Sequence, residues 1–546
     1  METNSRKEIG RACANFHPSV WGDWFVTTSS DEMIDVLTKQ RAEELKEQVK
    51  SMLSDVNDCL QELNLINEIQ RLGVAYHFEA EIKDALHKMY DAHINGNDVS
   101  DDLHATALWF RLLRQQGYNV SSNAFQRFKD EKGEFKATLK DDIRGLLSLY
   151  EAAYLGTRED KILDEAIHFT TEHLKLAMPY LSSPLSNLVQ LALDVPLQKR
   201  VERLQSRYYI SIYQEEEEKN DVLLEFAKLD FNMLQSLHKK ELGDISRWWK
   251  ENDFSRKLPF IRDRVVECYF WVLGVYFEPR YSRARRMMTS IISLLSVLDD
   301  IYDVYGTLEE LELYTAALDR WDWAAMDLLP EYLKVHYNAL LNVVEKFEDE
   351  LSLEGKLYRI PYLKKAFMVV AKAYLVEARW ATTGYVPSLE EYMKNALLSS
   401  AYPTLTLASL VGMGDVAAKE TFEWAINVPK VVKAIGVICR LKDDITSNEL
   451  EQKRTHVASA IQCYMKEHGT TYTDTCKMFR EDAAGAWKDV NMECIEPIPV
   501  PREVIMRPLN LVRVIELLYQ HRDSYTNSAE ETKERITMVL VDPITV

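Results

Sequence analysis

The chain has 546 residues, of which 47% are hydrophobic and 28% charged, a balance typical of a globular protein with room for about two to four domains. Its net charge of −20 argues against nucleic-acid binding and against docking to an anionic membrane, because both depend on an excess of Lys and Arg. The seven cysteines are scattered and form no CxxC pair, which argues against a disulfide framework and against a zinc site.

The N-terminal leader, METNSRKEIG, lacks the apolar segment of a signal peptide and is short for an organelle transit peptide. No run of about eighteen apolar residues appears, so we expect no membrane span. Scattered cysteines fit a reducing compartment. We therefore expect a cytosolic protein, with a monomer favoured and a dimer as the alternative.

From Glu32 onward the pattern is helical, with apolar residues spaced three and four apart in segments such as 41–55 and 60–72. Gly and Pro number only 18 and 16, and little strict alternation is present, so we predict an all-α fold. The acidic run QEEEEKND at 214–221 is the best candidate for a domain boundary. It divides the chain into helical domains at 1–215 and 220–546, and the second contains nearly all of the candidate chemistry.

A first acidic cluster follows the apolar run 291–298 and consists of Asp299, Asp300 and Asp303. Asp299 and Asp303 are four residues apart and share one helix face, whereas Asp300 points about 100° away in a supporting position. Carboxylates this close repel one another unless a cation lies between them, and oxygen ligands suit Mg²⁺ or Mn²⁺. The alternative is a solvated helix end.

A second cluster follows the apolar run 434–439, with Asp443, Ser447 and Glu451 spaced four residues apart in one oxygen-bearing stripe. On its own this stripe is also typical of an amphipathic helix. Mg²⁺ usually binds one or two carboxylates together with substrate phosphates. Two such stripes facing each other would therefore clamp a diphosphate through several metal ions.

Basic and aromatic residues occur beside both clusters. Arg262, Arg264 and Arg440 can donate bidentate hydrogen bonds to a phosphate, although surface ion pairs, or a pair between Arg440 and Asp443, would explain them equally well. The aromatic candidates for a wall that stabilises a carbocation, or for ordinary core, are Trp271, Tyr302, Tyr402, Tyr519 and Tyr525. Pro403, within SSAYPT, predicts either a helix kink or a simple loop break.

Together these residues resemble the plant terpene synthase family, in its class I, sesquiterpene-forming branch. The resemblance covers essentially the whole chain and includes RACANFHPSVWGDWF, the Arg-x-Arg pair, DDIYD and DDITSNELE, in that order. It implies two all-α domains: a C-terminal class I α-bundle, and an N-terminal α-barrel-like domain that is catalytically silent. The N-terminal segment is implied to cap the active site.

The resemblance also implies a role for each candidate residue. Three Mg²⁺ ions, for which Mn²⁺ can substitute, would be bound by Asp299, Asp303, Asp443, Ser447 and Glu451. The substrate would be held by Arg262, Arg264, Arg440 and Tyr402. The pocket wall, its supporting acids and the loop that closes over it would comprise Trp271, Asp300, Tyr519, Asp523 and Tyr525.

One departure from the family pattern bears on the substrate. The family often has Arg-Arg or Arg-Pro near the N-terminus, but here Arg11 is followed by Ala12, and tandem Arg is typical of monoterpene synthases. No DxDD motif is present, so a cyclase started by protonation is not indicated. We therefore expect ionisation of farnesyl diphosphate, cyclisation, and a quench by deprotonation or by water. The alternatives are a monoterpene synthase acting on geranyl diphosphate, a chain-elongating prenyltransferase, and a helical scaffold without activity.

Overall fold

The computed structural model describes residues 14, 16–28, 35–94, 101–451 and 458–546, with residues 449–451 described in their backbone only. Within this part of the chain the fold is all-α, and the one pairing of β type is an isolated bridge between Lys129 and Phe135. The fold class expected from the sequence is confirmed.

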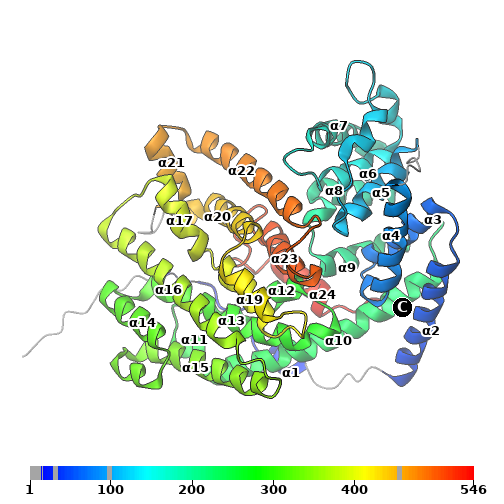
Figure 1. The fold of residues 1–546 in the computed structure, drawn as a ribbon. Helices are drawn as coiled ribbons and strands as arrows, with labels where there is room; N and C mark the ends of the chain where they lie inside the picture. The colour runs from blue at the N-terminus through cyan, green and yellow to red at the C-terminus, as the bar shows by residue number, and fades with distance from the viewer. Residues whose placement is uncertain (1–13, 15, 29–34, 95–100, 452–457) are drawn as a thin grey trace, which may run out of the picture.

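Two groups of helices lie side by side, and the long helix α10 extends from one group into the other (Figure 1). The first group comprises α2 (Val36–Asp55), α3 (Cys59–Arg71), α4 (Glu79–Ile94), α5 (Leu103–Gln115), α6 (Ile143–Ala153), α7 (Lys161–Ala177), α8 (Leu185–Asp194) and α9 (Glu202–Tyr213). The second group comprises α10 (Asp221–Asn252), α11 (Phe254–Lys257), α12 (Val265–Val275), α13 (Ser282–Asp300), α14 (Leu308–Arg320), α15 (Glu331–Ser352), α16 (Arg359–Thr383), α17 (Leu389–Ser399), α18 (Tyr402–Val411), α19 (Lys419–Ile426), α20 (Lys430–Glu451), α21 (Ala460–His468), α22 (Tyr472–Glu493), α23 (Arg502–Leu518) and α24 (Glu531–Leu540), and the short α1 (Trp24–Thr28) packs on it.

The acidic run that marks the sequence boundary lies in the turn between α9 and α10. Asn220 caps α10, because its side-chain oxygen accepts a hydrogen bond from the backbone N–H of Leu223 at 3.0 Å. The first half of α10 buries Phe226 and Phe231 in the core of the first group, and its second half buries Leu242 and Trp249 in the core of the second. The two hydrophobic cores therefore meet within one continuous helix.

Buried polar contacts fix α13, the helix that carries the first acidic cluster. Arg285 on α13 is fully buried and makes a bidentate ion pair with Glu241 on α10, with both N–O distances at 2.8 Å. His336 on α15 makes a 2.8 Å hydrogen bond from Nε2 to the carbonyl of Leu294, one and a half turns before the acidic cluster. Its other ring nitrogen accepts from the hydroxyl of Tyr314. A buried ion pair or imidazole is tolerated only when hydrogen-bonded in this way.

Two helix irregularities occur next to the predicted site residues. A π-helical turn, Ile301–Tyr305, follows α13 directly, so DDIYD spans a change of helical pitch. At SSAYPT the chain breaks between α17 and α18 at Ala401, whose φ of 61° lies in the left-handed region, and Pro403 occupies the first turn of the new helix. The loop break is therefore observed rather than the kink.

The two ends of the described chain are attached to different halves of α10, and Ile544 near the C-terminal end packs into the core of the first group. Near the N-terminal end, Phe25 packs into its core and Asp23 pairs with Lys250 on α10 at 2.6 Å. Near the C-terminal end, Ile544 exchanges two hydrogen bonds of 2.8 Å with the side chain of Asn232 on α10. None of the described helices is both long and apolar enough to cross a bilayer.

Candidate active site

One cavity of about 270 Å³ brings together most of the residues singled out in the sequence. Its wall comes from α12, α13 with the following π turn, α16, the α17–α18 junction, α20 and the segment after α23. The predicted residues that line it are Arg262, Trp271, Asp299, Asp300, Tyr302, Asp303, Tyr402, Arg440, Asp443, Ser447, Tyr519, Asp523 and Tyr525. Arg264 does not line it, and the side chain of Glu451 lies outside the described residues.

The first acidic cluster is paired with Arg262. Asp299 is 38% exposed and contacts the guanidinium at 2.6 Å, whereas Asp300 is buried and accepts both from the guanidinium Nε, at 2.9 Å, and from the backbone N–H of Arg262, at 2.7 Å. Burial disfavours the charge on Arg262, but Asp300 and Asp299 outweigh it and raise the pKa of the guanidinium. Asp300 thus holds Arg262 in place, and Asp303 lines the same cavity from the π turn.

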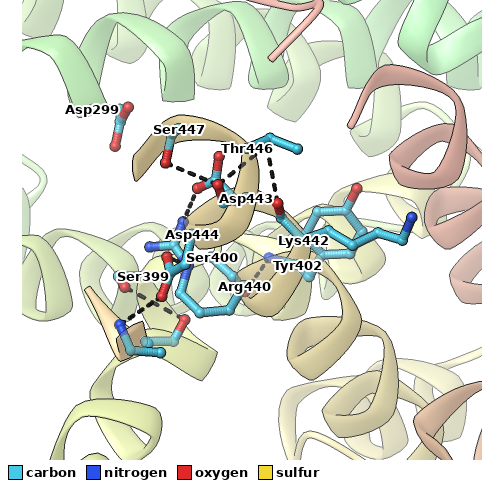
Figure 2. A network of polar contacts seen from close by, with 12 residues as sticks. Asp299, Ser399, Ser400, Tyr402, Arg440, Lys442, Asp443, Asp444, Thr446 and Ser447 are labelled. Atoms are coloured by element: carbon cyan, nitrogen blue, oxygen red, sulfur yellow. Dashed lines mark hydrogen bonds and ion pairs between the residues drawn. The ribbon is translucent and has the colours of Figure 1, made fainter. Parts of the chain in front are cut away.

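The second cluster is paired with Arg440 in the same manner (Figure 2). The guanidinium of Arg440 forms a short ion pair with Asp443 and lies 3.4 Å from buried Asp444. Asp444 also accepts from the hydroxyl of Tyr392 at 2.9 Å and from the backbone N–H of Ala460 at 2.8 Å. The i, i+3 pair considered for Arg440 is therefore present, and it lies inside the cavity rather than on the surface.

Arg264 is placed differently from its sequence neighbour. It is only 1% exposed, and its guanidinium donates to the backbone carbonyls of His17, Thr526 and Asp263 at 2.9–3.0 Å. These contacts hold the terminal nitrogens of Arg264 outside the cavity lining. It ties the N-terminal segment to the segment after α23, and its contact with the substrate stays a prediction.

Aromatic rings form another part of the cavity wall, and the ring of Tyr525 lies 5.4 Å from the guanidinium of Arg262. Trp271 lies 5.5 Å from Tyr525 and 6.5 Å from Tyr519, both edge to face. Tyr402 is 1% exposed and donates to the carbonyl of Leu511 at 3.3 Å, so its orientation is fixed. Ring faces directed into a cavity attract a cation through their quadrupoles. The end of α17 borders the same space, and the C-terminus of a helix also favours positive charge.

The segment from 523 to 526 is ordered by Asp523. Its carboxylate accepts from the backbone N–H groups of Tyr525, at 3.0 Å, and Thr526, at 2.9 Å, and this forms a tight turn. The turn aims the hydroxyl of Tyr525 at Ser296 on α13, 2.6 Å away. Asp523 therefore acts by shaping the rim of the cavity.

Sequence reasoning missed Glu377 on α16, which lines the cavity from the side between the two acidic clusters. Asn395 donates to its carboxylate at 3.3 Å and Ser399 also donates to it. Burial raises the pKa of Glu377 to about 7, against the pull of nearby Arg440. Its signal in the sequence is a single acid within the apolar run AYLVEARW, which is too weak to stand out. Phe16 of the N-terminal segment, also missed, lines the same cavity.

The charge of this wall fits bound cations. Seven carboxylates and two guanidinium groups line the cavity, which leaves an excess of five negative charges when all are ionised. No three Asp, Glu, His or Cys side chains in the described part of the chain come close enough to hold a metal by themselves. Mg²⁺ sites of this kind have oxygen ligands and excess negative charge, and substrate phosphates complete the coordination.

Comparisons with known proteins agree with this geometry. Residues 20–193 match the terpene synthase N-terminal domain, and residues 250–489 match the terpene synthase family metal-binding domain. The chain is 65% identical to "Sesquiterpene synthase TPS2" of Cananga odorata over 98% of this chain and 95% of that one. It is 59% identical to "Beta-cubebene synthase" of Magnolia grandiflora over 98% of both chains.

Solved structures share the fold over nearly the whole chain. A limonene synthase with 2-fluorolinalyl diphosphate superposes with a TM-score of 0.92 at 35% identity, covering 98% of this chain and 100% of that chain. Isoprene synthase from grey poplar, in complex with three Mg²⁺ ions and a thiolodiphosphate, gives 0.88 at 36% identity, covering 93% and 98%. With both domain families matched and relatives similar from end to end, this chain belongs to the terpene synthase family.

Proposed function

We propose that the protein is a sesquiterpene synthase that ionises farnesyl diphosphate and cyclises the resulting cation. The observation that carries this proposal is the meeting of two acidic stripes, each held by an arginine, with an aromatic wall in one cavity. The C15 substrate is supported by full-length relatives that are named sesquiterpene, beta-cubebene and germacrene D synthases.

Mg²⁺ is the cofactor in this proposal, bound by Asp299 and Asp303 on one side of the cavity and by Asp443, Ser447 and Glu451 on the other. When bound it would neutralise the diphosphate and make it a better leaving group. The excess negative charge of the cavity and its oxygen donors support this assignment. The isoprene synthase structure, which is a complex with three Mg²⁺ ions, is consistent with the same number here.

Arg262 and Arg440 supply the protein's own electrostatic contribution. Each is already held at the cavity by carboxylates, so no large rearrangement is needed for their guanidinium groups to contact a diphosphate. Donors that are pre-organised where negative charge develops lower the barrier to its departure. The acids that now pair with these arginines would then turn to the metal ions.

The apolar and aromatic wall governs the fate of the cation. Trp271, Tyr402 and Tyr525 are each at most 7% exposed, so the reacting chain is shielded from water that would trap the cation early. Their ring faces stabilise positive charge while the chain folds and closes a ring. Loss of a proton or addition of water then ends the reaction, and diphosphate is released.

The two halves of the chain have different roles in the proposed enzyme. We assign residues 1–215 to a catalytically silent domain and 220–546 to the catalytic domain, with the N-terminal segment capping the site. Phe16 at the cavity and the bond from Arg264 to His17 support the cap, while Arg11 lies outside the described residues. A monomeric state and a cytosolic location remain predictions, testable by light scattering and by imaging of a fluorescent fusion.

The decisive experiment is incubation of purified protein with Mg²⁺ and farnesyl diphosphate under an organic overlay, analysed by gas chromatography–mass spectrometry. A cyclic C15 product that disappears with EDTA is the expected result. Product from geranyl diphosphate alone would instead indicate a monoterpene synthase, which the similarity to limonene synthase makes the relevant comparison. No product from either substrate with folded protein would refute the cyclase assignment.

A further inference from the structure

A second and larger cavity, of about 720 Å³, lies between the two helical groups. One side is formed by α3, α4, α5 and α9, and the other by the segment 277–281 and the first half of α23. It shares no lining residue with the candidate active site. The activity proposed above therefore does not account for this cavity.

The charge of this second cavity is opposite to that of the first. Nine arginines and lysines line it against five glutamates, in a chain whose net charge is −20. Several of these charges are paired across the cavity, as in the bidentate contact between Arg280 and Glu79. The positive excess is concentrated at one end, where Arg71, Arg111 and Arg200 lie together.

Carboxylates neutralise these three arginines only in part. Arg111 is 5% exposed and donates to the neutral side-chain oxygens of Asn67 and Gln115. Arg71 stacks over the ring of Tyr209 at 4.3 Å, and neither it nor Arg111 forms an ion pair with any described residue. Arg200 has a single carboxylate contact, a 3.4 Å pair with Glu151.

Two of the arginines have lowered pKa values, because they are buried and lie near another guanidinium. Burial, and next to it the charge of Arg71, lowers the pKa of Arg111 to about 10. Burial likewise lowers the pKa of Arg200 to about 10, against the pull of Glu151. A guanidinium normally titrates above 12, and burial is the main cause of both lowered pKa values, with the charge of Arg71 adding to it.

The unmet hydrogen-bonding capacity at this end consists of donors. Gln205 is 5% exposed, and its side-chain oxygen accepts from Arg200 at 2.6 Å, which fixes the orientation of the amide. Its Nε2 is then a buried donor without a partner among the described residues, and so is Nε of Arg71. Buried polar groups are almost always satisfied. A ligand that meets these donors must be rich in acceptors and negatively charged.

We propose that this cavity binds a phosphate-bearing anion, with the phosphate group held by Arg71, Arg111 and Gln205. A phosphate offers at least three acceptor oxygens and a charge near −2, which matches three guanidinium groups beside one glutamate, and arginine binds phosphate bidentately. The remaining volume, bordered by Tyr76, Tyr281 and Met506, has room for an organic group on the phosphate.

The test is a titration of the purified full-length protein with inorganic diphosphate in EDTA, followed by calorimetry and by thermal melting. EDTA removes the divalent cations by which the active site is proposed to hold diphosphate, and loss of the remaining signal in the variants below assigns it to the second cavity. We expect saturable binding to one site and a higher melting temperature. The same binding in D299N would separate it from the active site, and it would remain even if the cyclase assignment failed.

Three variants locate the site. R71Q should lose at least about tenfold in affinity, the effect of one charge-assisted contact. Q205E is nearly isosteric and should lose as much, because its carboxylate replaces the unmet donor and repels the anion; it serves if R71Q folds poorly. K83Q removes an exposed charge from the rim of the same cavity and should bind within about twofold of the unchanged protein.

Companion titrations identify the source of the phosphate. Glycerol 3-phosphate that binds more tightly than inorganic phosphate would point to a phosphorylated metabolite, whereas tighter binding of the inorganic anions would point to free phosphate or diphosphate. The proposal fails if the protein shows no saturable binding in EDTA, or if sodium chloride at equal ionic strength gives the same shift. It also fails if R71Q and Q205E bind as well as the unchanged protein.

Discussion

Arg262 and Arg440 each hold a pair of neighbouring carboxylates, one pair at the end of α13 and the other on α20. In both pairs one acid is almost fully buried and the other faces the cavity. The buried acid keeps the arginine in place, and the exposed one is available to a ligand. These two different roles explain why two adjacent aspartates occur in both motifs.

The exposed member of the first pair gives the sharpest test of the site. D299N should lower turnover of farnesyl diphosphate by at least about 100-fold, because a neutral amide binds a divalent cation poorly. The free energy of unfolding should change by less than about 1 kcal/mol, because Asp299 is partly exposed and Arg262 keeps Asp300 as its partner.

Activity would be followed by product formation and stability by thermal melting. The matched control is D319N on α14, which breaks an exposed pair with Lys372 far from the cavity and should leave turnover unchanged. Near-normal turnover of D299N with Mg²⁺ would remove Asp299 from the metal site.

His336 makes a pH-dependent contribution to stability. Burial lowers its pKa to about 4, whereas the unfolded chain binds the same proton near pH 6.5. Between these values the unfolded state holds a proton that the folded state lacks, so the free energy of unfolding falls as the pH falls. Between pH 7 and pH 5, protonation of this residue in the unfolded state should lower the free energy of unfolding by about 2 kcal/mol.

Urea unfolding of the protein and of H336Q at both pH values would measure this effect. The variant should be less stable at pH 7 but lose about 2 kcal/mol less on acidification, because carboxylate titrations are common to both proteins. Equal losses in the two proteins would show that His336 accepts a proton in the folded state.

At the scale of elements, α13 and α18 approach each other closely through a glycine. A Cβ on Gly412, which ends α18, would lie 2.5 Å from the Cα of Ala284 on α13. Backbone atoms cannot move aside as a flexible side chain can, so the helices must separate to admit a methyl group. Gly412 therefore sets the distance between the helix of the first acidic cluster and the helix of Tyr402.

G412A should destabilise the protein by about 1–3 kcal/mol, the usual cost of overpacking, and should reduce turnover as well. G414A, two residues later, is the matched control because nothing lies within 4 Å of its Cβ. Thermal melting monitored by circular dichroism compares them. A G412A protein as stable as G414A would mean that the helix pair adapts without strain.

Most helices follow from apolar periodicity, and the acidic turn at 214–221 coincides with the junction of α9 and α10. The π turn at Ile301–Tyr305 could not be foreseen, since no propensity distinguishes one extra residue in a helical turn. The residue types also identified the stripes on α13 and α20. Local patterns do not encode contacts between segments far apart in sequence. Such contacts pair Arg262 with Asp299 and hold Arg264 outside the cavity lining.

At the scale of the whole molecule, buried hydrogen bonds hold the two helical groups together. Asn491 on α22 is 4% exposed and donates at 2.9 Å to the carbonyls of Tyr154 and Gly156 in the other group. Its oxygen accepts from Gln198 at 3.1 Å. By contrast, the contact between Arg280 and Glu79 spans the same interface with both side chains substantially exposed.

N491A should cost about 3 kcal/mol, because it leaves buried polar groups of the opposite group without partners. R280Q should cost less than about 1 kcal/mol, as an exposed ion pair does. Scanning calorimetry should show the N491A transition lowered or split into two, with R280Q close to the unchanged protein. Equal effects of both variants would contradict the ranking by burial.

Arg264 makes hydrogen bonds to the carbonyls of both His17 and Thr526, so the N-terminal segment is a poor place to attach a second enzyme. The N-terminal segment reaches the cavity, where Phe16 forms part of the wall. The C-terminal residue Val546 is 60% exposed, beyond the attachment of Ile544 to α10. A fusion with the enzyme that makes its prenyl diphosphate should therefore be linked through Val546, which leaves the N-terminal segment and its contacts with the cavity undisturbed.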